Sequence, residues 1–398
     1  MNNSKSFTTI INYLFVFLTI NYRLIVSFVT HVDSAGYGLI ALSFLVLVLN
    51  AKKINLLQLK KPVVFWLIWC VYAFLNYYSH PHTNISFPVF TLYRKIFIPL
   101  IVLTVVITEY ERNTNRLLWL CFITHAVYMA AGYYFDRGIL YRIDDEENQL
   151  GNAYAIISSF TIFYAMLLNR KKKIPMPVFL IIVVFIILVL AMAGTRKAFG
   201  AGLLLLAFWG WSLLNMKRIW TWVLVFFFVG GGLWGYNYLM ENTYIGDRMD
   251  YLEKQQQEES VLPSDAPKHL NALGDRAPLY YYGWHIFLSH PLFGVGAGQA
   301  NVNGTYIHSE YMSQLADNGI IGFVLLFLLY FWVIRKLVKK NNNNKEIGRC
   351  MIGGLVCMLF LFLTAWAWEF PRYFICLGVL VGYCQDDSTT TIKDLQEV

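Results

Sequence analysis

The chain has 398 residues, of which 57% are hydrophobic and only 14% are charged, and its mean hydropathy is +0.49. A soluble globular domain is roughly 45–50% apolar and about 25% charged, so this composition excludes an ordinary soluble protein. The net charge of +8 fits basic loops that face anionic headgroups, and we expect no nucleic-acid partner.

Apolar runs along the chain predict an all-α, polytopic integral membrane protein with about twelve transmembrane helices. The predicted spans are 8–30, 36–50, 62–79, 96–109, 116–135, 151–168, 175–193, 199–215, 220–239, 319–338, 349–368 and 372–385. The six cysteines lie in or beside these runs, which indicates buried small side chains and no disulfide framework.

Basic residues collect in every second loop between these spans, as in Lys52–Lys53 and Arg170–Lys173. The positive-inside rule therefore places these loops and both termini in the cytoplasm. The predicted organisation is helices one to nine over residues 1–239, a large extracytoplasmic loop over 240–318, helices ten to twelve over 319–385 and a cytoplasmic tail over 386–398.

The large loop is the exception in this alternating pattern. It is about eighty residues long, and loops of this length in compact proteins usually carry function. Its sequence predicts a polar helix at DRMDYLEKQQQEE and an amphipathic, aromatic-rich helix at APLYYYGWHIFLSH, which ends at Pro291. We expect these helices to lie over the membrane.

The sequence GTRKA places Arg196 and Lys197 at the outer mouth of the eighth span. A cation at a membrane boundary usually extends its charged end to the headgroups, and this explanation suffices for Lys197. Arg196 follows a Gly-Thr break on the outer side, where the positive-inside rule disfavours cations, so a functional role is favoured for it.

Arg276 begins a second stretch of interest, which ends in the glycine run Gly294, Gly296 and Gly298. Guanidinium groups form forked hydrogen bonds to phosphate oxygens, and glycines allow a backbone to approach an anion closely. The stretch lacks the strand–helix context of a nucleotide-binding fingerprint. Arg142, in the outer loop before span six, is a further candidate, with a solvated loop and helix start as the alternative.

His308 lies in the run Tyr306-Ile-His308-Ser-Glu310-Tyr311, directly before span ten. Its imidazole titrates near neutral pH and suits proton transfer, although a lone histidine is more often structural. Tyr306 and Glu310 flank it and are candidate substrate-binding residues. His308 and Glu310 lack the HExxH spacing of a metal site, so no metal ion is expected.

Three stretches in this order, GTRKAFG, HPLFGVGAGQ and HSEYMSQLADNGIIGF, resemble the O-antigen ligase and polymerase superfamily, most specifically over residues 275–330. The resemblance implies a membrane glycosyltransferase of the GT-C type. It implies transfer of a glycan from undecaprenyl pyrophosphate to an acceptor on the outer side of the bacterial inner membrane. That acceptor is the lipid A core for a ligase and another lipid-linked repeat unit for a polymerase.

The family's functional residues carry over by their place in these motifs. Arg196 matches the arginine at a helix mouth, His308 matches the essential histidine, and Arg276 matches the loop arginine, with Arg248 as the second candidate. Ser309 departs from the pattern, since ligases often have asparagine after the histidine. This departure leaves the choice of acceptor open.

The chemistry of these residues agrees with the resemblance. Two outer arginines would stabilise a pyrophosphate leaving group, and His308 would take the proton of the acceptor hydroxyl in an inverting displacement that needs no metal ion or other cofactor. The alternative is a lipid-linked oligosaccharide flippase, for which intramembrane charges and two similar halves are expected. The predicted spans carry almost no charge apart from Arg23, which favours the enzyme.

Overall fold

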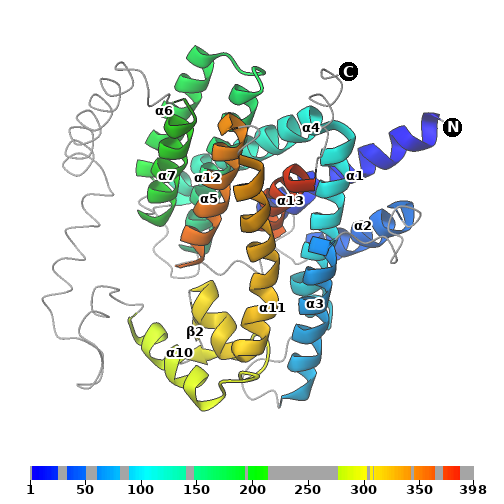
Figure 1. Ribbon diagram of the computed structural model, residues 1–398, viewed down its shortest axis with the longest axis vertical. Coiled ribbons are helices and arrows are strands. Elements are labelled where there is room, and N and C mark those ends of the chain that lie inside the picture. The colour runs from blue at the N-terminus through cyan, green and yellow to red at the C-terminus, as the bar shows by residue number, and fades with distance from the viewer. Residues whose placement is uncertain are drawn as a thin grey trace, which may run out of the picture. The chain divides into compact units, whose positions relative to one another are not determined.

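The computed structural model describes residues 2–25, 34–50, 61–80, 89–139, 148–192, 196–213, 277–302, 305–307, 309–341, 345–363 and 371–385. Within these ranges the chain is helical apart from one hairpin of two two-residue strands and short turns (Figure 1). The all-α class is therefore confirmed, with that small hairpin as a departure from it. The predicted span 220–239 and the predicted helix at DRMDYLEKQQQEE lie outside the described residues.

The chain divides into two compact units, each of which combines segments that are distant in sequence. The first unit comprises Met1–Thr124, Asp275–Asn343 and Met358–Val398, and the second comprises His125–Gly274 and Asn344–Cys357. The segment 275–318, which precedes the apolar part of α11, therefore belongs with the N-terminal helices, whereas the GTRKA sequence belongs to the second unit.

The first unit is built around α3 and α11, which run side by side (Figure 1). Its described elements are α1 (Asn2–Ile25), α2 (Ser34–Asn50), α3 (Lys61–Ser79), the first part of α4 (Val89–Ile139), α10 (Ala277–Ser289), β1 (Asn301–Val302), β2 (Thr305–Tyr306), α11 (Glu310–Asn341) and α13 (Pro371–Gln385). α10 packs on α11, and α1 packs on α2 and α13. The helix predicted at APLYYYGWHIFLSH is confirmed as α10.

The second unit contains the rest of α4 together with four further helices. These are α5 (Asn148–Arg170), α6 (Met176–Met192), α7 (Arg196–Leu213) and most of α12 (Lys345–Phe362). α5 packs against both α6 and α7. Close packing is possible because glycines meet aromatic rings, as at Gly354, where a Cβ atom would lie 2.4 Å from the ring of Phe163.

The predicted spans 96–109 and 116–135 both lie within α4, which has no loop between them. The helix is interrupted at Asn113, whose backbone is extended (φ −158°, ψ 83°). The side-chain oxygen of Asn113 accepts a hydrogen bond from the N–H of Arg116 at 3.1 Å, as a helix N-cap does. Asn113 therefore ends one helix and begins the next.

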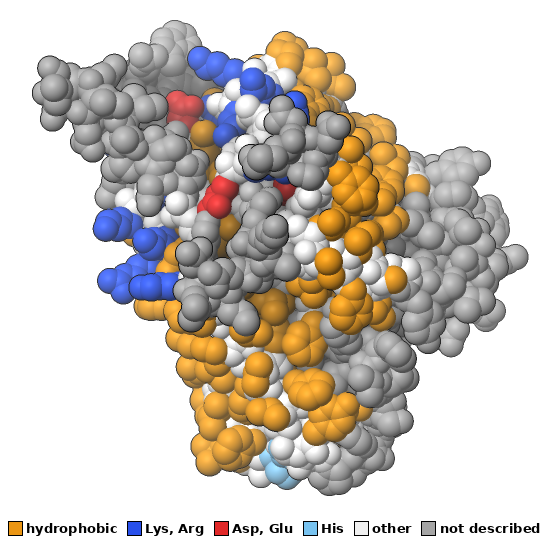
Figure 2. Space-filling model, turned by 90° about the vertical axis from the view of Figure 1, so that its right-hand side faces the viewer, with side chains coloured by type: hydrophobic (Ala, Val, Ile, Leu, Met, Phe, Trp, Pro, Cys, Tyr) orange, Lys and Arg blue, Asp and Glu red, His pale blue; other side chains and the backbone are white. Residues whose placement is uncertain are grey.

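The surface of the described helices is that of an integral membrane protein. α3 and the segment Glu310–Lys340 are long and apolar enough to cross a membrane, and several shorter apolar helices accompany them. α6 carries no charged residue and exposes large side chains such as Ile181 (70%) and Val184 (58%). Figure 2 shows hydrophobic side chains across the lower part of one face, without Lys, Arg, Asp or Glu among the described residues there. The number of twelve spans stays a prediction.

Candidate active site

Three of the seven predicted site residues lie among the residues that the structure describes. Glu310 is described in full, and Arg196 and Tyr306 are described in their backbone only; Arg142, Arg248, Arg276 and His308 lie outside the described residues. The two neighbours of His308 in the chain, Ile307 and Ser309, are described. They show how the chain is held on either side of that histidine.

The chain before His308 is anchored by a hairpin and a buried isoleucine. β1 and β2 pair antiparallel, with Asn301 opposite Tyr306 and Val302 opposite Thr305. Ile307 follows, is fully buried, and packs with the buried Ala300 and Ala316 and with side chains of α10 and α11.

Gly283 of α10 makes this anchor possible. A Cβ atom at Gly283 would lie 2.8 Å from Cδ1 of Ile307 and 3.0 Å from Cγ of Met312, which is closer than side chains normally approach. The glycine in the aromatic run YYYGW thus lets α10 lie directly on the residue that precedes His308.

The chain after His308 begins α11, and Ser309 is its N-cap. The Ser309 hydroxyl oxygen accepts a hydrogen bond from the N–H of Met312 at 3.4 Å, and its carbonyl accepts one from the N–H of Ser313 at 2.9 Å. Ser309 is 2% exposed, and its hydroxyl donates to the carbonyl of Phe362 at 3.5 Å. Asparagine is a comparably good N-cap, so an asparagine at this position would also suit the start of α11.

A polar ladder of three buried side chains follows along α11: Glu310, Gln314 and Asn318. The amide of Gln314 donates to Oε1 of Glu310 at 3.1 Å, and the amide of Asn318 donates to Oε1 of Gln314 at 2.9 Å. All three are at most 2% exposed. Glu310 thus lies in the interior, and its predicted role in substrate binding stays a prediction.

Two side chains of α3 hold the end of this ladder. The two N–H groups of the Asn76 amide are shared among three acceptors, which are the carbonyl of Phe293 at 3.0 Å, the carbonyl of Asp317 at 3.1 Å and Oδ1 of Asn318 at 3.0 Å. The Tyr72 hydroxyl donates to the carbonyl of Asn318 at 2.7 Å. A single amide therefore connects α3, α11 and the loop that follows α10.

The α11 joint is the place where residues 291–296 meet residues 316–321. α11 is broken at Gly319 (φ 63°, ψ −171°), so the N–H groups of the next two residues lack helical partners. The loop supplies them, since Ile320 donates to Pro291 at 2.9 Å and Ile321 donates to Leu292 at 3.3 Å.

The joint is reciprocal, because the loop also uses the carbonyls that the broken helix leaves free. The N–H of Val295 donates to the carbonyl of Ala316 at 3.0 Å, and the N–H of Gly296 donates to that of Asp317 at 2.9 Å. The stretches HPLFGVG and LADNGIIG are thus the two halves of one structural feature.

Glycines are required where the two halves touch. Gly294 and Gly319 both have positive φ, and a Cβ atom on either would lie 2.4 or 2.3 Å from a backbone carbon of the other half. The amides of Gly294 and Gly296 are already bonded to the carbonyls of His290 and Asp317. The predicted use of these two glycines for approach to an anion is therefore corrected to a use in chain packing.

Asp317 ties the same loop to α11 a second time. Its carboxylate Oδ1 accepts a hydrogen bond from the N–H of Ala300 at 2.7 Å, immediately before β1, and the side chain is 1% exposed. Sequence analysis gave no role to Asp317, Asn76 or Asn318. The local signal that was available is Asp-Asn-Gly directly before an apolar run, which is typical of a chain break.

Arg196 is the first residue of α7 in the second unit. The Ser159 hydroxyl of α5 donates to the carbonyl of Ala198 at 3.0 Å and so fixes the first turn of α7. A helix N-terminus carries a partial positive charge and free N–H groups, so an arginine there is disfavoured unless an anion binds. This position agrees with the expectation that Arg196 has a functional role.

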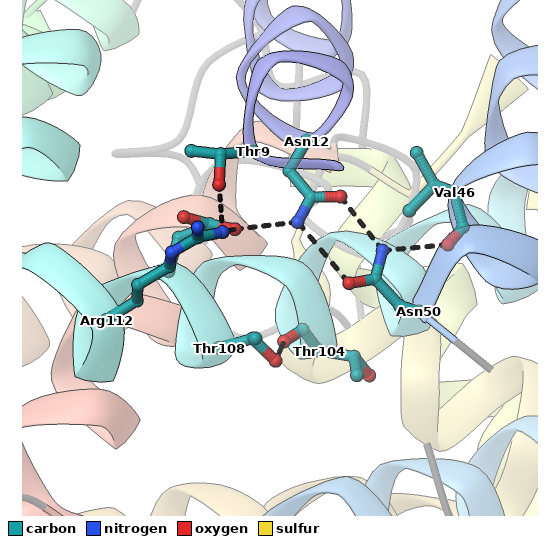
Figure 3. A network of polar contacts seen from close by, with 8 residues as sticks. Thr9, Asn12, Val46, Asn50, Thr104, Thr108 and Arg112 are labelled. Carbon is teal, nitrogen blue, oxygen red and sulfur yellow. Dashed lines mark hydrogen bonds and ion pairs between the residues drawn. The ribbon is translucent and has the colours of Figure 1, made fainter. Parts of the chain in front are cut away.

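A separate polar network joins α1, α2 and α4 in the first unit (Figure 3). The Asn12 amide donates to Oε1 of Glu109 at 2.7 Å, and the Asn50 amide donates to Oδ1 of Asn12 at 2.9 Å. Arg112 lies 3.9 Å from Glu109 and donates to the Thr9 hydroxyl. Glu109, the last residue of the predicted span 96–109, is fully buried, so the expected near-absence of charge inside the spans overlooked this carboxylate.

Among the described residues, no three side chains of His, Cys, Asp or Glu gather where they could hold a metal ion. Comparison with known families shows that residues 181–327 match the model of a family described as O-antigen ligase. The match contains α7, α10, the α11 joint and the run around His308. It confirms the resemblance found in the motifs. No curated protein matches the chain.

Proposed function

We propose that this chain, whose residues 181–327 match the O-antigen ligase family, is a member of the O-antigen ligase and polymerase superfamily and an inverting membrane glycosyltransferase. It moves a glycan from undecaprenyl pyrophosphate to an acceptor at the outer face of the bacterial inner membrane. The acceptor is the lipid A core if the chain is a ligase and a lipid-linked repeat unit if it is a polymerase. We further propose the twelve-span GT-C architecture with both termini in the cytoplasm.

The observation that carries this proposal is the anchoring of the chain on both sides of His308. Ile307 is fully buried before it, and the buried cap Ser309 begins a helix directly after it. A general base works only when its imidazole is held within hydrogen-bond reach of the proton that it removes. The burial of Ile307 and Ser309, the described residues on either side of this position, supports that role.

The reaction follows from the proposed residues. The acceptor hydroxyl attacks the anomeric carbon of the donor glycan while His308 takes the hydroxyl proton. The bond from the anomeric carbon to the pyrophosphate oxygen breaks, the configuration inverts, and the charge stays on the leaving pyrophosphate. Arg196 and Arg276 stabilise that charge through forked hydrogen bonds, with Arg142 and Arg248 as further candidates for the same anion. No metal ion or other cofactor enters this scheme.

Reconstituted protein tests the proposal directly. Liposomes that contain the protein and an undecaprenyl-pyrophosphate glycan should yield free undecaprenyl pyrophosphate and a larger glycan or glycolipid. His308→Ala should lower this rate by about 10²–10⁴-fold, as loss of a general base does. His290→Ala is the matched control, because His290 is exposed and its side chain has no proposed role. Full activity of His308→Ala would refute the mechanism.

The same liposomes separate the enzyme from the flippase and the ligase from the polymerase. Movement of the donor lipid between leaflets without a new glycosidic bond would support a flippase instead. The donor alone, and the donor with purified lipid A core, are supplied in two parallel reactions. Chain growth in the first indicates a polymerase, and product formed only in the second indicates a ligase.

A further inference from the structure

The segment 277–309 contains no Lys, Arg, Asp or Glu in 33 consecutive residues. The predicted topology places it outside the membrane, where a helix surface in contact with water normally carries charges. α10, the helix in this segment, has 13 residues and is about 20 Å long, too short to cross a hydrocarbon core of about 30 Å. The composition of a membrane helix therefore occurs in a helix that cannot span a membrane.

The exposed side of α10 has two different edges. Trp284 (44% exposed) and Leu288 (52%) are four residues apart and so lie on one edge of the helix. The neighbouring edge carries His285 and Ser289, which are also exposed. They follow Trp284 and Leu288 directly in the chain and therefore lie about 100° further around the helix. The opposite face, with Leu279 and Gly283, is buried in the protein. α10 thus presents outward one apolar edge and one neighbouring edge, which carries His285, Ser289 and the phenol ring of Tyr282 (41% exposed).

The apolar edge continues into the turn after α10. Leu292 and Phe293 are 57% and 52% exposed. Through the α11 joint, this turn is bonded to Ile320 and Ile321, which are 40% and 36% exposed at the start of the apolar part of α11. Figure 1 shows α10 beside this end of α11.

Beyond the joint, α11 exposes Val324 (49%), Leu328 (36%) and Phe331 (64%) along a segment long enough to cross a membrane. One apolar surface therefore runs from the edge of α10 through the turn to the lipid-facing side of α11. Its continuity with that side identifies lipid as the occupant of the α10 edge.

We propose that α10 and the turn after it rest in the outer leaflet of the membrane. Trp284, Leu288, Leu292 and Phe293 lie at the boundary between headgroups and acyl chains, and His285 and Ser289 face water. This placement does not depend on the reaction. If the proposed function also holds, the joint keeps the chain around His308 at headgroup depth, where the pyrophosphate of a lipid-linked donor lies.

Spin labels on the full-length protein in phospholipid liposomes test this placement. Leu288→Cys and Ser289→Cys are labelled separately, and collisions with oxygen, which concentrates in lipid, are compared with collisions with a water-soluble nickel complex. The six native cysteines are buried, and unsubstituted protein treated in the same way gives the background. Phe331→Cys on the exposed side of α11 gives the reference value for lipid.

The label at 288 should resemble the label at 331, with an oxygen-to-nickel ratio several-fold higher than at 289. Equal nickel access at 288 and 289 would overturn the proposal, because both edges would then face water. Shielding of 288 from both reagents would also overturn it, because protein, such as a second copy of the chain, would then cover the edge. The measurement needs no substrate, so it stands or falls separately from the proposed reaction.

Discussion

The carboxylate of Asp317 and the amide of Asn76 each bind main-chain groups of the loop between α10 and β1. Neither side chain has a place in the proposed chemistry. Both are nevertheless almost fully buried, at 1% and 5% exposure, and both act within a few residues of the glycine-rich motif. Their function is to hold the loop that leads to His308, and the consequences of removing them can be predicted.

Asp317→Ala should leave the N–H of Ala300 buried without its acceptor. An unsatisfied buried donor costs about 1–3 kcal/mol, so thermal unfolding of the detergent-solubilised protein should shift downward and glycosyl transfer should fall. Asp317→Asn keeps an oxygen acceptor in the same place, so it should retain most of the thermal stability and most of the glycosyl transfer activity. Equal damage from the two substitutions would mean that the charge of Asp317 matters and not this hydrogen bond.

Ser309 offers a test of the capping interpretation. Ser309→Ala and Ser309→Gly both lose the hydrogen bond to Phe362. Beyond this shared loss, Ser309→Ala should lower the unfolding free energy by about 1 kcal/mol, and Ser309→Gly should lower it by only a few tenths of a kcal/mol. Calorimetry or chemical denaturation in detergent gives both values. Ser309→Asn should leave the choice between the two acceptors unchanged, and a switch of acceptor in this variant would show that position 309 does more than cap α11.

At the scale of elements, the α11 joint explains why the helix is longer than the predicted span 319–338. The helix begins at Glu310, and Gly319 redirects it where the polar part meets the apolar part. The loop after α10 replaces the hydrogen bonds that a continuous helix would have made. α10 and α11 are thereby joined through backbone groups, which side-chain substitutions elsewhere do not remove.

Gly319→Ala should disrupt this joint. The added Cβ atom would lie 2.3 Å from the carbonyl carbon of Leu292, and φ is positive at this position, so loop and helix must separate. We expect a large loss of thermal stability and near-complete loss of activity. Gly210→Ala in α7 is the control, because nothing lies within 4 Å of its Cβ and alanine favours a helix by about 0.5–1 kcal/mol. Similar effects of the two substitutions would contradict the conclusion that the α11 joint requires glycine at position 319.

The polar network of Figure 3 connects three elements of the first unit, and a double-mutant cycle tests it. Asn12 and Asn50 exchange two hydrogen bonds, at 2.9 and 3.4 Å, and Asn12 also holds Glu109. Asn12→Ala and Asn50→Ala should each destabilise the protein, with a coupling energy of about 0.5–3 kcal/mol between them. Additive effects would show that the two asparagines act independently.

At the scale of the whole molecule, basic and aromatic side chains meet at helix ends. Arg349 lies 4.8 Å from the ring centroid of Trp211 in the second unit, and Lys340 lies 4.6 Å from that of Tyr383 in the first. Such pairs are typical of a membrane interface, and the positive-inside rule predicts a cytoplasmic location for Arg349 and for Lys340.

Thiol labelling from one side of the membrane tests this topology. Lys172 is exposed in the turn between α5 and α6, and Ser289 is exposed at the end of α10. In intact spheroplasts a membrane-impermeant reagent should label Ser289→Cys and should reach Lys172→Cys only after the membrane is opened. The reverse pattern would invert the topology and place the proposed site in the cytoplasm.

The sequence by itself predicted the all-α membrane class, most of the helices that are described, among them α10, and the resemblance to the O-antigen ligase family that residues 181–327 match. Hydropathy and helix periodicity are local properties, so a window of about 20 residues contains all that these predictions need. The motifs that resemble the family are likewise contiguous in the chain. The predicted role of His308 therefore came from sequence, and the structure adds that its described neighbours in the chain, Ile307 and Ser309, are buried.

Only the tertiary structure decided what the glycines, Asn76, Asp317 and Glu109 do. Asn76 meets Phe293 and Asp317 across separations of 217 and 241 residues, and Asn12 meets Glu109 across 97. No local pattern specifies such pairs, because a buried amide and a solvated one look alike in sequence until the fold brings an acceptor to it. Burial then decides the role, since a polar group removed from water must find its partner inside the protein.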